Sequence, residues 1–491
     1  MIIVLVVSLY TTRVIIDALG VEDYGIYNVV AGFVSMFTFL SSAMNNGIQR
    51  FYNFELGRNG DFGVKIVYNV SLRVQLALAI LLFVSIGFIG WWYIGHKMVL
   101  PPGRIIDAEW LFLAAMFSLA FVMLQVPYSA VVIAKERMSF YSIMSILHTL
   151  LALLIAILIK HSSLNHLVLY GALLALAQFV MLMIYYIYTR HQFKEIRIER
   201  KSDKTLLKSI LGFSGWNLFG TFGGVMKEQG TNLILNLFCG PVVNAARGVA
   251  AQVNGGFQSL VSNLNTAVRP QVTQSYAQGD IDRTMRLTYS SSKLSSMALF
   301  MFSYPIMLEI DYILSVWLGK NIPDDTAIFI IIVVLCSFFG NLNSGVSGVV
   351  HSTGKMKWYQ IVGSIINLIA LPIVYFLLFI GFSADVAMWS LFLIAALTQL
   401  VALIVLKKII KYSLKDYWTD VVWPIILVCG VSILPPYLIH HYMQPGFSRF
   451  ITVFIFSILE IGLVIYILGL TKSERTLMLS TVHIQKNNKN G

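Results

Sequence analysis

Charged residues are scarce in this sequence of 491 residues. Only 12% of its residues are charged, whereas soluble proteins carry about 25%. Hydrophobic residues make up 57% of the chain, and the mean hydropathy is +0.77. This composition excludes an ordinary soluble globular domain.

Cysteine and the usual enzyme motifs are also rare or missing. Cys239, Cys336 and Cys429 are far apart and lack any CxxC or Cys/His spacing, so we predict packing roles for them, with no disulfide and no metal site. The sequence contains no Walker loop, GxSxG motif or HExxH motif, and no large external loop with paired carboxylates. We therefore predict that the chain is not an enzyme and binds no cofactor. ATP-driven transport by this chain alone is disfavoured.

Long hydrophobic runs, in contrast, recur along the whole chain. A helix needs about 20 apolar residues to cross about 30 Å of hydrocarbon, and only helices or closed barrels satisfy the backbone there. The pattern predicts an all-α polytopic membrane protein with about 14 transmembrane helices. The predicted spans are 2–16, 24–44, 72–95, 110–134, 140–159, 164–188, 210–238, 242–268, 294–308, 328–350, 359–379, 386–406, 421–439 and 451–470.

The basic residues predict the orientation. The 35 Lys and Arg exceed the 23 Asp and Glu, giving a net charge of +12, and the positive-inside rule explains this excess better than binding of nucleic acid. If the end of the second span is cytoplasmic, most Lys and Arg fall on the cytoplasmic face, and we predict a bacterial inner-membrane protein with both termini in the cytoplasm. Lys227 and Arg247 lie inside apolar runs. The opposite face receives only Arg13, Lys97, Arg104, Lys160, Lys320 and Arg449.

Two internal matches indicate a duplication. Residues 131–153 align without gaps to residues 349–371, and the region after Leu19-Gly20 aligns to the region after Cys239-Gly240 at nearly the same offset. Because six helices precede the repeat, both halves enter the membrane in the same direction, as parallel repeats do in some transporters. We predict an N-terminal six-helix lobe at 1–189, a basic cytoplasmic linker at 190–208, a C-terminal six-helix lobe at 209–408, and an extra helix pair with a cytoplasmic tail at 409–491.

The first span is short. Only about fifteen apolar residues precede Asp17, and no basic segment precedes them. We expect either a misassigned start codon or a sequence that has been shortened at its N-terminus. A signal peptide is disfavoured because no small-residue cleavage pattern follows the run.

Charged residues inside the predicted spans are the main candidates for function, because each costs at least about 2.5 to 3.5 kcal/mol near the centre of the bilayer. Lys227 and Glu228 lie in the seventh span, and Arg247 follows on the next helix after a short turn, so the two polar faces are expected to meet. One interpretation is a hydrated cavity wall, where Lys227 and Arg247 bind an anionic substrate and Glu228 couples transport to an ion. The other is a structural ion pair between adjacent helices. Lys227 and Glu228 themselves are not expected to pair, because neighbours on an α-helix point about 100° apart.

Three further arginines, Arg13, Arg50 and Arg269, lie near predicted helix ends. The planar guanidinium suits bidentate contact with phosphate, which makes them candidates for binding a pyrophosphate group. The competing interpretation is that they extend to the membrane interface.

Two smaller patterns receive structural interpretations. Gly220 and Gly224 have GxxxG spacing, which predicts close helix packing. His440 and His441 lack a ligand partner at useful spacing and are predicted to lie on the surface.

Several motifs resemble those of a known family. They resemble the first helical hairpin and later segments of bacterial polysaccharide flippases, in the multidrug/oligosaccharidyl-lipid/polysaccharide exporter superfamily, which includes O-antigen unit flippases and the lipid II flippase. The motifs are Thr12–Ile16, Leu19–Val30, Gln49–Phe51, Glu55–Gly57, Trp317–Gly319 and Thr353–Lys357.

The resemblance implies two six-helix lobes in a V and fourteen helices in all. It further implies a flippase that moves undecaprenyl-pyrophosphate-linked oligosaccharide repeat units across the inner membrane by alternating access. Arg13 and Arg50 match basic positions of such relatives, and Arg269 occupies a comparable place in the second half. The implied partners are the lipid-linked oligosaccharide, membrane lipid, a coupling ion (proton or sodium) and glycan-assembly proteins.

Two alternatives remain open. A multidrug/cation antiporter of the same fold would favour an acidic cavity, and Lys227 and Arg247 argue against one. A membrane glycan polymerase or acyltransferase would need a sizeable periplasmic loop, and the longest candidates, 96–109 and 311–325, are short.

Overall fold

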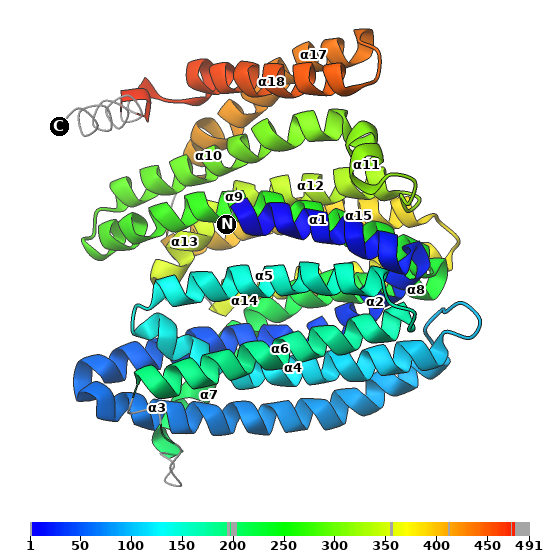
Figure 1. Cartoon of the computed structure of the whole chain (residues 1–491). Coiled ribbons are helices and arrows are strands. Elements are labelled where there is room, and N and C mark those ends of the chain that lie inside the picture. The colour runs from blue at the N-terminus through cyan, green and yellow to red at the C-terminus, as the bar shows by residue number, and fades with distance from the viewer. Residues whose placement is uncertain are drawn as a thin grey trace, which may run out of the picture. The chain divides into compact units, whose positions relative to one another are not determined.

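The computed structural model describes residues 2–193, 197, 204–353, 357–410, 413–472 and 474–476. Within these ranges every regular element is a helix (Figure 1), as the sequence predicts. Residues 194–196 and 198–203 of the predicted linker, 190–208, lie outside the described residues. The α-helices are α1 (Ile2–Leu19), α2 (Val21–Ser35), α3 (Thr38–His96), α4 (Ile105–Ala134), α5 (Met138–Lys160), α6 (His166–Gln192), α7 (Lys204–Val225), α8 (Thr231–Cys239), α9 (Pro241–Ala277), α10 (Ile281–Leu308), α11 (Ile310–Leu318), α12 (Thr326–Leu342), α13 (Ser344–Thr353), α14 (Lys357–Phe379), α15 (Ala384–Ile410), α16 (Leu414–Tyr417), α17 (Trp423–Tyr442) and α18 (Phe447–Val464). Among the described residues there are also three π-helical segments. η1 (Met226–Gly230) joins α7 to α8, η2 (Trp418–Val422) joins α16 to α17, and η3 (Ile465–Gly469) continues α18.

The contacts between residues divide the chain into two compact units. Unit 1 comprises Met1–Gln252, Trp317–Phe329 and Gly363–Leu391, and unit 2 comprises Val253–Val316, Ile330–Val362 and Phe392–Gly491. The predicted lobes were defined by an internal repeat in the sequence. Spatial contacts do not test such a repeat, so the division into two lobes stays a prediction.

Unit 1 is built around the bundle of α3, α4, α5 and α6. α4 packs between α3 and α6, and α5 packs on α6 (Figure 1). α1 packs on α5, and α2 packs on α4. The core contains aromatic residues whose polar ends are bonded internally: the hydroxyls of Tyr68 and Tyr128 lie 3.2 Å apart, and Tyr52 donates to the carbonyl oxygen of Pro127. The hydroxyls of these three buried Tyr side chains are therefore paired inside the bundle.

In unit 2, several helices pack against α10. The helix contacts α13 and both members of the C-terminal pair, α17 and α18, which lie side by side in Figure 1. Apolar residues such as Met297, Val421 and Ile461 are buried in this cluster. A buried ammonium group also ties the chain after η3 to α10, since Lys293 lies 2.7 Å from Glu474.

Eight of the described helices are long and apolar enough to cross a membrane, or up to eleven if three bent helix pairs each count as one span. The number of about 14 therefore stays a prediction. The bend of 48° between α12 and α13 lies inside the predicted span 328–350, and the bend of 75° between α10 and α11 lies at Glu309, directly after the predicted span 294–308. The predicted spans 24–44 and 72–95 leave a loop between them, but α3 runs through this region as a helix. The helix is interrupted at Gly60, whose φ of 58° is not helical.

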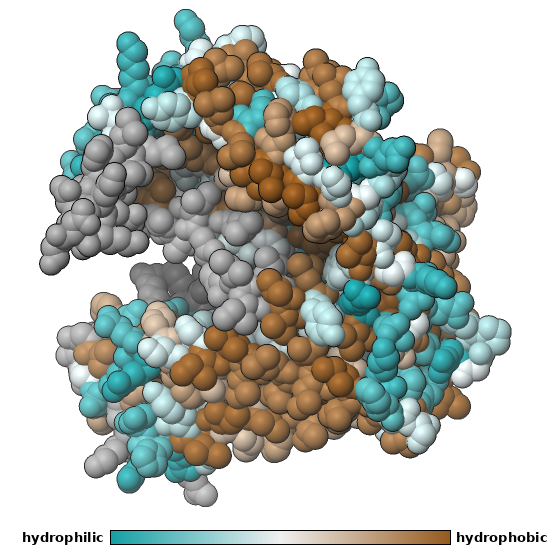
Figure 2. Space-filling model, turned by 45° about the horizontal axis from the view of Figure 1, so that its top comes forward, coloured by the Kyte–Doolittle hydropathy of each residue, from teal (hydrophilic) through white to brown (hydrophobic). Residues whose placement is uncertain are grey.

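The surface has the character expected for a membrane protein. In the lower part of Figure 2, hydrophobic side chains form a broad area bordered by hydrophilic residues at both ends. In the most hydrophobic window of the Gly60–His96 span, only 22% of residues are buried inside the protein, while the mean hydropathy is 2.3. Apolar side chains that are not buried in protein are suited to contact with lipid, so the chain is a multi-pass membrane protein.

A charged cluster at a π-helical segment

Matched glycines shape the two turns that lead into this part of unit 1. Gly20 joins α1 to α2 with φ 82°, and Gly240 joins α8 to α9 with φ 78°. Both residues come from the second internal match in the sequence, and a left-handed conformation favours glycine. Pro241 then occupies the first position of α9, where its missing N–H leaves no helical bond unmade.

Close backbone approach brings α2 against η1, α8 and the start of α9. A Cβ on Gly25 would lie 1.9 Å from the carbonyl oxygen of Pro241, and one on Gly248 would lie 2.5 Å from Oδ1 of Asn28. A Cβ on Gly32 would lie 2.7 Å from Oε1 of Gln229. No larger side chain fits at these three positions without movement of the neighbouring atoms, so the glycines set the distance between the helices.

Asparagine side chains link the same elements by hydrogen bonds. Asn232 donates to the carbonyl oxygen of Asn28 at 3.0 Å, and Asn244 donates to both the carbonyl and the side-chain oxygen of Asn232 at 2.7 Å. Asn236 donates to Asn244 at 3.2 Å and accepts from the backbone N–H of Val99 at 3.0 Å. Because buried amides need partners, this network fixes the orientation of α8 and α9. Asn28 and Asn244 were not predicted from the sequence, since a single Asn in an apolar run carries little signal.

The three charged candidates Lys227, Glu228 and Arg247 come together at η1, and we call them the charged cluster. Arg247 on α9 donates through Nη2 to the carbonyl oxygen of Glu228 at 2.8 Å and to its Oε2 at 3.1 Å. The predicted meeting of the two polar faces is thus confirmed. The expectation that Lys227 and Glu228 do not pair is wrong, because Nζ of Lys227 lies 3.8 Å from Oε1 of Glu228. The α-helical angle of 100° does not hold here, because the residues lie in a π-helical turn.

The π-helical turn explains the backbone contacts. A π-bulge changes the normal i→i−4 pattern of bonds and often lies at a functional site. The carbonyl oxygen of Glu228 accepts from Arg247, and that of Lys227 accepts from the hydroxyl of Thr231 at 2.6 Å. Arg247 is therefore both a local structural support and a charge.

Exposure differs strongly within the charged cluster. The side chain of Arg247 is 7% exposed and that of Lys227 is 18% exposed, whereas Glu228 is 57% exposed. Two cations face one carboxylate, so the ionised cluster carries a net charge of +1. A carboxylate that is more than half exposed is costly against hydrocarbon, so this face suits water or a polar ligand.

The other three candidate arginines are not joined to the charged cluster by any described contact. Arg13 is exposed on α1. Arg50 and Arg269 lie in α3 and α9, but their side chains are outside the described residues. Their assignment to a pyrophosphate stays a prediction.

Comparisons with known proteins agree with this architecture. The MatE family model matches residues 225–376, a range that contains the whole charged cluster. The lipid II flippase MurJ, in an inward closed conformation, aligns with a TM-score of 0.71 and 14% identity, covering 94% of this chain and 96% of that chain. An inward-facing multidrug resistance MATE family transporter of the MOP superfamily aligns with a TM-score of 0.67 and 12% identity, covering 82% of this chain and 94% of that chain.

A MOP superfamily transporter from Pyrococcus furiosus aligns with a TM-score of 0.54 and 11% identity, covering 83% of this chain and 95% of that chain. No curated protein matches the sequence. At these identities the similarity establishes the fold, and the chain is a polytopic helical membrane protein with the fold of MOP-superfamily transporters.

Proposed function

We propose that this protein is a flippase for undecaprenyl-pyrophosphate-linked oligosaccharide repeat units, moving them from the cytoplasmic to the periplasmic leaflet of the bacterial inner membrane by alternating access. The observation that carries the proposal is the charged cluster, a site with two cations and one carboxylate on two adjacent predicted spans of a fold shared with a lipid II flippase. Both termini are cytoplasmic in this proposal. The six-helix lobes at 1–189 and 209–408 are its moving parts.

The charge balance fits a substrate with a pyrophosphate. A hydrophilic oligosaccharide cannot cross hydrocarbon unaided, and positive side chains beside water offset the charge of its phosphates. Lys227 supplies a compact ammonium group that remains partly exposed, and Arg247 holds the turn that presents it. Arg13, Arg50 and Arg269 are proposed as further contacts to the pyrophosphate.

Glu228 is proposed as the ion-coupling residue. Its carboxylate contacts both cations of the cluster and is also open to its surroundings. A proton or a sodium ion bound there would weaken the attraction of Glu228 for Lys227 and Arg247. Both cations would then attract an anion more strongly, so ion binding and substrate binding would influence each other. Glycan-assembly proteins are the proposed suppliers and acceptors of the substrate.

The direct test is translocation of a labelled lipid-linked oligosaccharide in vesicles. The wild type is compared with Lys227→Met, Arg247→Lys and the control Lys97→Ala, whose lysine is exposed outside the cluster. We expect translocation to fall about tenfold or more in the first two variants and to stay unchanged in the control. Unchanged translocation in both cluster variants would remove the cluster from the site. A parallel assay for glycan chain extension separates a flippase from a polymerase, and one for acyl transfer separates it from an acyltransferase.

A multidrug/cation antiporter is the second candidate. It is favoured by the match to the MatE model and by the exposed carboxylate of Glu228, which suits a cation. Efflux of a fluorescent cationic dye that is lost in Glu228→Gln, together with no movement of the lipid-linked oligosaccharide, would establish this function instead.

A further inference from the structure

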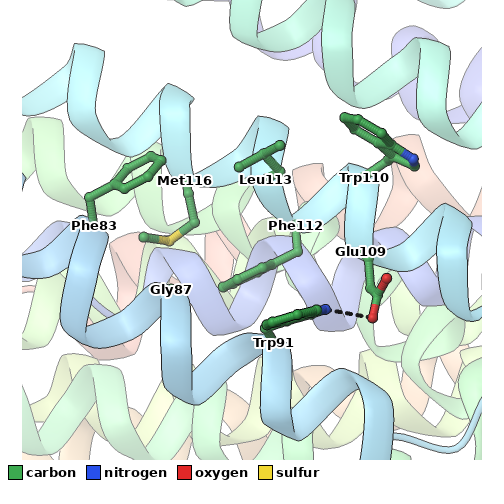
Figure 3. Close-up of a pocket in the computed structure, with 8 residues that line it drawn as sticks. All are labelled: Phe83, Gly87, Trp91, Glu109, Trp110, Phe112, Leu113 and Met116. Atoms are coloured by element: carbon green, nitrogen blue, oxygen red, sulfur yellow. Dashed lines mark hydrogen bonds between the residues drawn. The ribbon is translucent and has the colours of Figure 1, made fainter.

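A groove of about 410 Å³ runs along the outer face of α3 and α4, well separated in sequence from the charged cluster. Figure 3 shows Trp91, Glu109 and Trp110 at one end of the groove, and Phe83 and Met116 at the other. Its remaining lining is apolar except for Gly87, where the absence of a side chain leaves open space.

A second groove of similar volume, about 410 Å³, lies on the other side of α4, against α6. Trp110 and Leu113 line both grooves, so the two share a ridge on α4. The second groove extends from Trp110 to Phe121, while Ala172 and Ala175 on α6 form part of its other wall. Two apolar grooves that start at one point have the form required by a ligand with two hydrocarbon chains.

The position along the helices places these grooves in the bilayer. Trp91 lies five residues before the end of α3 and Glu109 four residues after the start of α4, so both are about 6 to 8 Å inside the helix ends. Phe83 lies about 12 Å further along α3. Trp91 and Trp110 are 60% and 57% exposed, as is typical of the aromatic belt where head groups meet acyl chains.

Glu109 is the chemical feature that distinguishes this end of the grooves. Its Oε1 accepts a hydrogen bond of 2.6 Å from the indole N–H of Trp91 (Figure 3). Among the residues that the structure describes, no basic side chain forms an ion pair with it. A carboxylate has about four acceptor positions, so it retains capacity for an N–H donor that comes from outside the protein.

We propose that the two grooves hold the acyl chains of a single phospholipid whose head group carries a primary ammonium, with that ammonium bound to Glu109. The ammonium is complementary in charge to the carboxylate, and the indoles of Trp91 and Trp110 add cation–π attraction. A primary ammonium donates three hydrogen bonds, whereas a quaternary ammonium donates none. An anionic head group is repelled by Glu109. The site therefore selects a phosphatidylethanolamine-type lipid.

The test measures which lipid stays on the intact protein. The wild type is placed in nanodiscs with equal amounts of phosphatidylethanolamine, its N-methylated derivatives, phosphatidylcholine and phosphatidylglycerol, and retained lipid is counted by native mass spectrometry. We expect one phosphatidylethanolamine per chain, with preference over phosphatidylcholine of at least about tenfold. The preference should fall as methyl groups replace N–H donors.

Variants separate the head-group contact from the grooves. Glu109→Gln should lose the preference, and Asp324→Asn, which removes an exposed carboxylate elsewhere, should keep it. Gly87→Leu and Ala172→Leu each fill one groove and should reduce retention of every lipid. Gly95→Leu, on the same helix as Gly87 but outside the groove, should behave as wild type. Equal retention of all lipids by the wild type, or retention that Gly87→Leu does not change, would overturn the proposal.

Discussion

The guanidinium of Arg449 contacts both oxygens of the Glu309 carboxylate: Nε lies 2.9 Å from Oε1, and Nη2 lies 2.9 Å from Oε2. The side chain of Glu309 is completely buried, and His440 places its Nδ1 2.8 Å from Oε1. Glu309 lies at the bend between α10 and α11, His440 near the end of α17 and Arg449 near the start of α18. One carboxylate thus ties the turn of the C-terminal helix pair to a bent helix.

Removing the cation from this buried carboxylate should destabilise unit 2. Arg449→Ala leaves Glu309 buried with only His440 beside it, and breaking a buried ion pair costs about 3 to 5 kcal/mol. Arg449→Lys keeps the charge but loses the planar fork, so we expect an intermediate loss. The measurement is the melting temperature of the purified protein in detergent, with Arg283→Ala as a control at an exposed arginine of α10. Equal melting of wild type and Arg449→Ala would show that the contact contributes nothing.

Protonation of Glu474 at acidic pH should lower the stability of the protein. Burial raises the pKa of Glu474, but hydrogen bonds from Lys293, Ser290 and the backbone N–H of Thr471 outweigh it, so the net pKa lies below its ordinary value. A folded-state pKa below the unfolded one contributes stability that is present above about pH 4.3 and is lost as the pH falls through the folded-state pKa.

The measurement compares melting of the wild type and Glu474→Gln across pH. We expect the wild type to melt higher near pH 7 and the two proteins to converge below about pH 4, because a protonated Glu474 resembles the glutamine. A difference in melting temperature that stays constant across this range would contradict the assignment. It would mean that the contact with Lys293 does not depend on the charge of Glu474.

Close packing around the charged cluster can be tested at glycines. Gly25→Ala places a Cβ against the carbonyl oxygen of Pro241, so α2 and α9 must separate, at a cost of about 1 to 3 kcal/mol. Gly224→Ala on α7 meets open space and should be neutral or slightly stabilising, because alanine favours a helix over glycine by up to about 1 kcal/mol. Melting temperatures of the two variants provide the comparison. A Gly25→Ala protein as stable as Gly224→Ala would mean that the helices do not approach so closely.

The sequence predicted features that depend on composition and on repeated local signals. Hydrophobic runs identified the helices of the membrane protein, and the paired glycines Gly20 and Gly240 adopt matching left-handed turns. Charges in apolar runs also indicated that Glu228 and Arg247 would meet. Such features could be predicted because they follow from the cost of polar groups in hydrocarbon.

Features that depend on tertiary contact were missed or predicted wrongly. Close packing was expected at Gly220 and Gly224. The surroundings of Gly220 lie outside the described residues, and Gly224 meets open space, whereas a Cβ on the neighbouring Gly223 would lie 2.4 Å from Cα of Ser364. His440 was expected on the surface, but it is half-buried and bonds to Glu309, a residue far away in sequence. No local pattern marks the π-helical turn that lets Lys227 approach Glu228.

The contacts of Arg247 allow its structural role to be separated from its charge. Arg247 bonds both to a backbone carbonyl of η1 and to the carboxylate of Glu228. The carboxylate is 57% exposed, and ion pairs at exposed positions contribute at most about 1 kcal/mol. We therefore expect Glu228→Gln to change the free energy of unfolding by less than about 1 kcal/mol. Arg247→Met, which also removes the bond to the carbonyl, should cost about 1.5 to 3 kcal/mol.

A double-mutant cycle of melting measurements checks this asymmetry. If the carbonyl contact dominates, the double variant is about as unstable as Arg247→Met alone, and the coupling to Glu228 is small. A Glu228→Gln protein that loses as much stability as Arg247→Met would instead make the pair a structural ion pair. With the expected result, a transport defect in Glu228→Gln cannot be attributed to unfolding, because the exposed carboxylate would be acting through the ion or substrate it contacts.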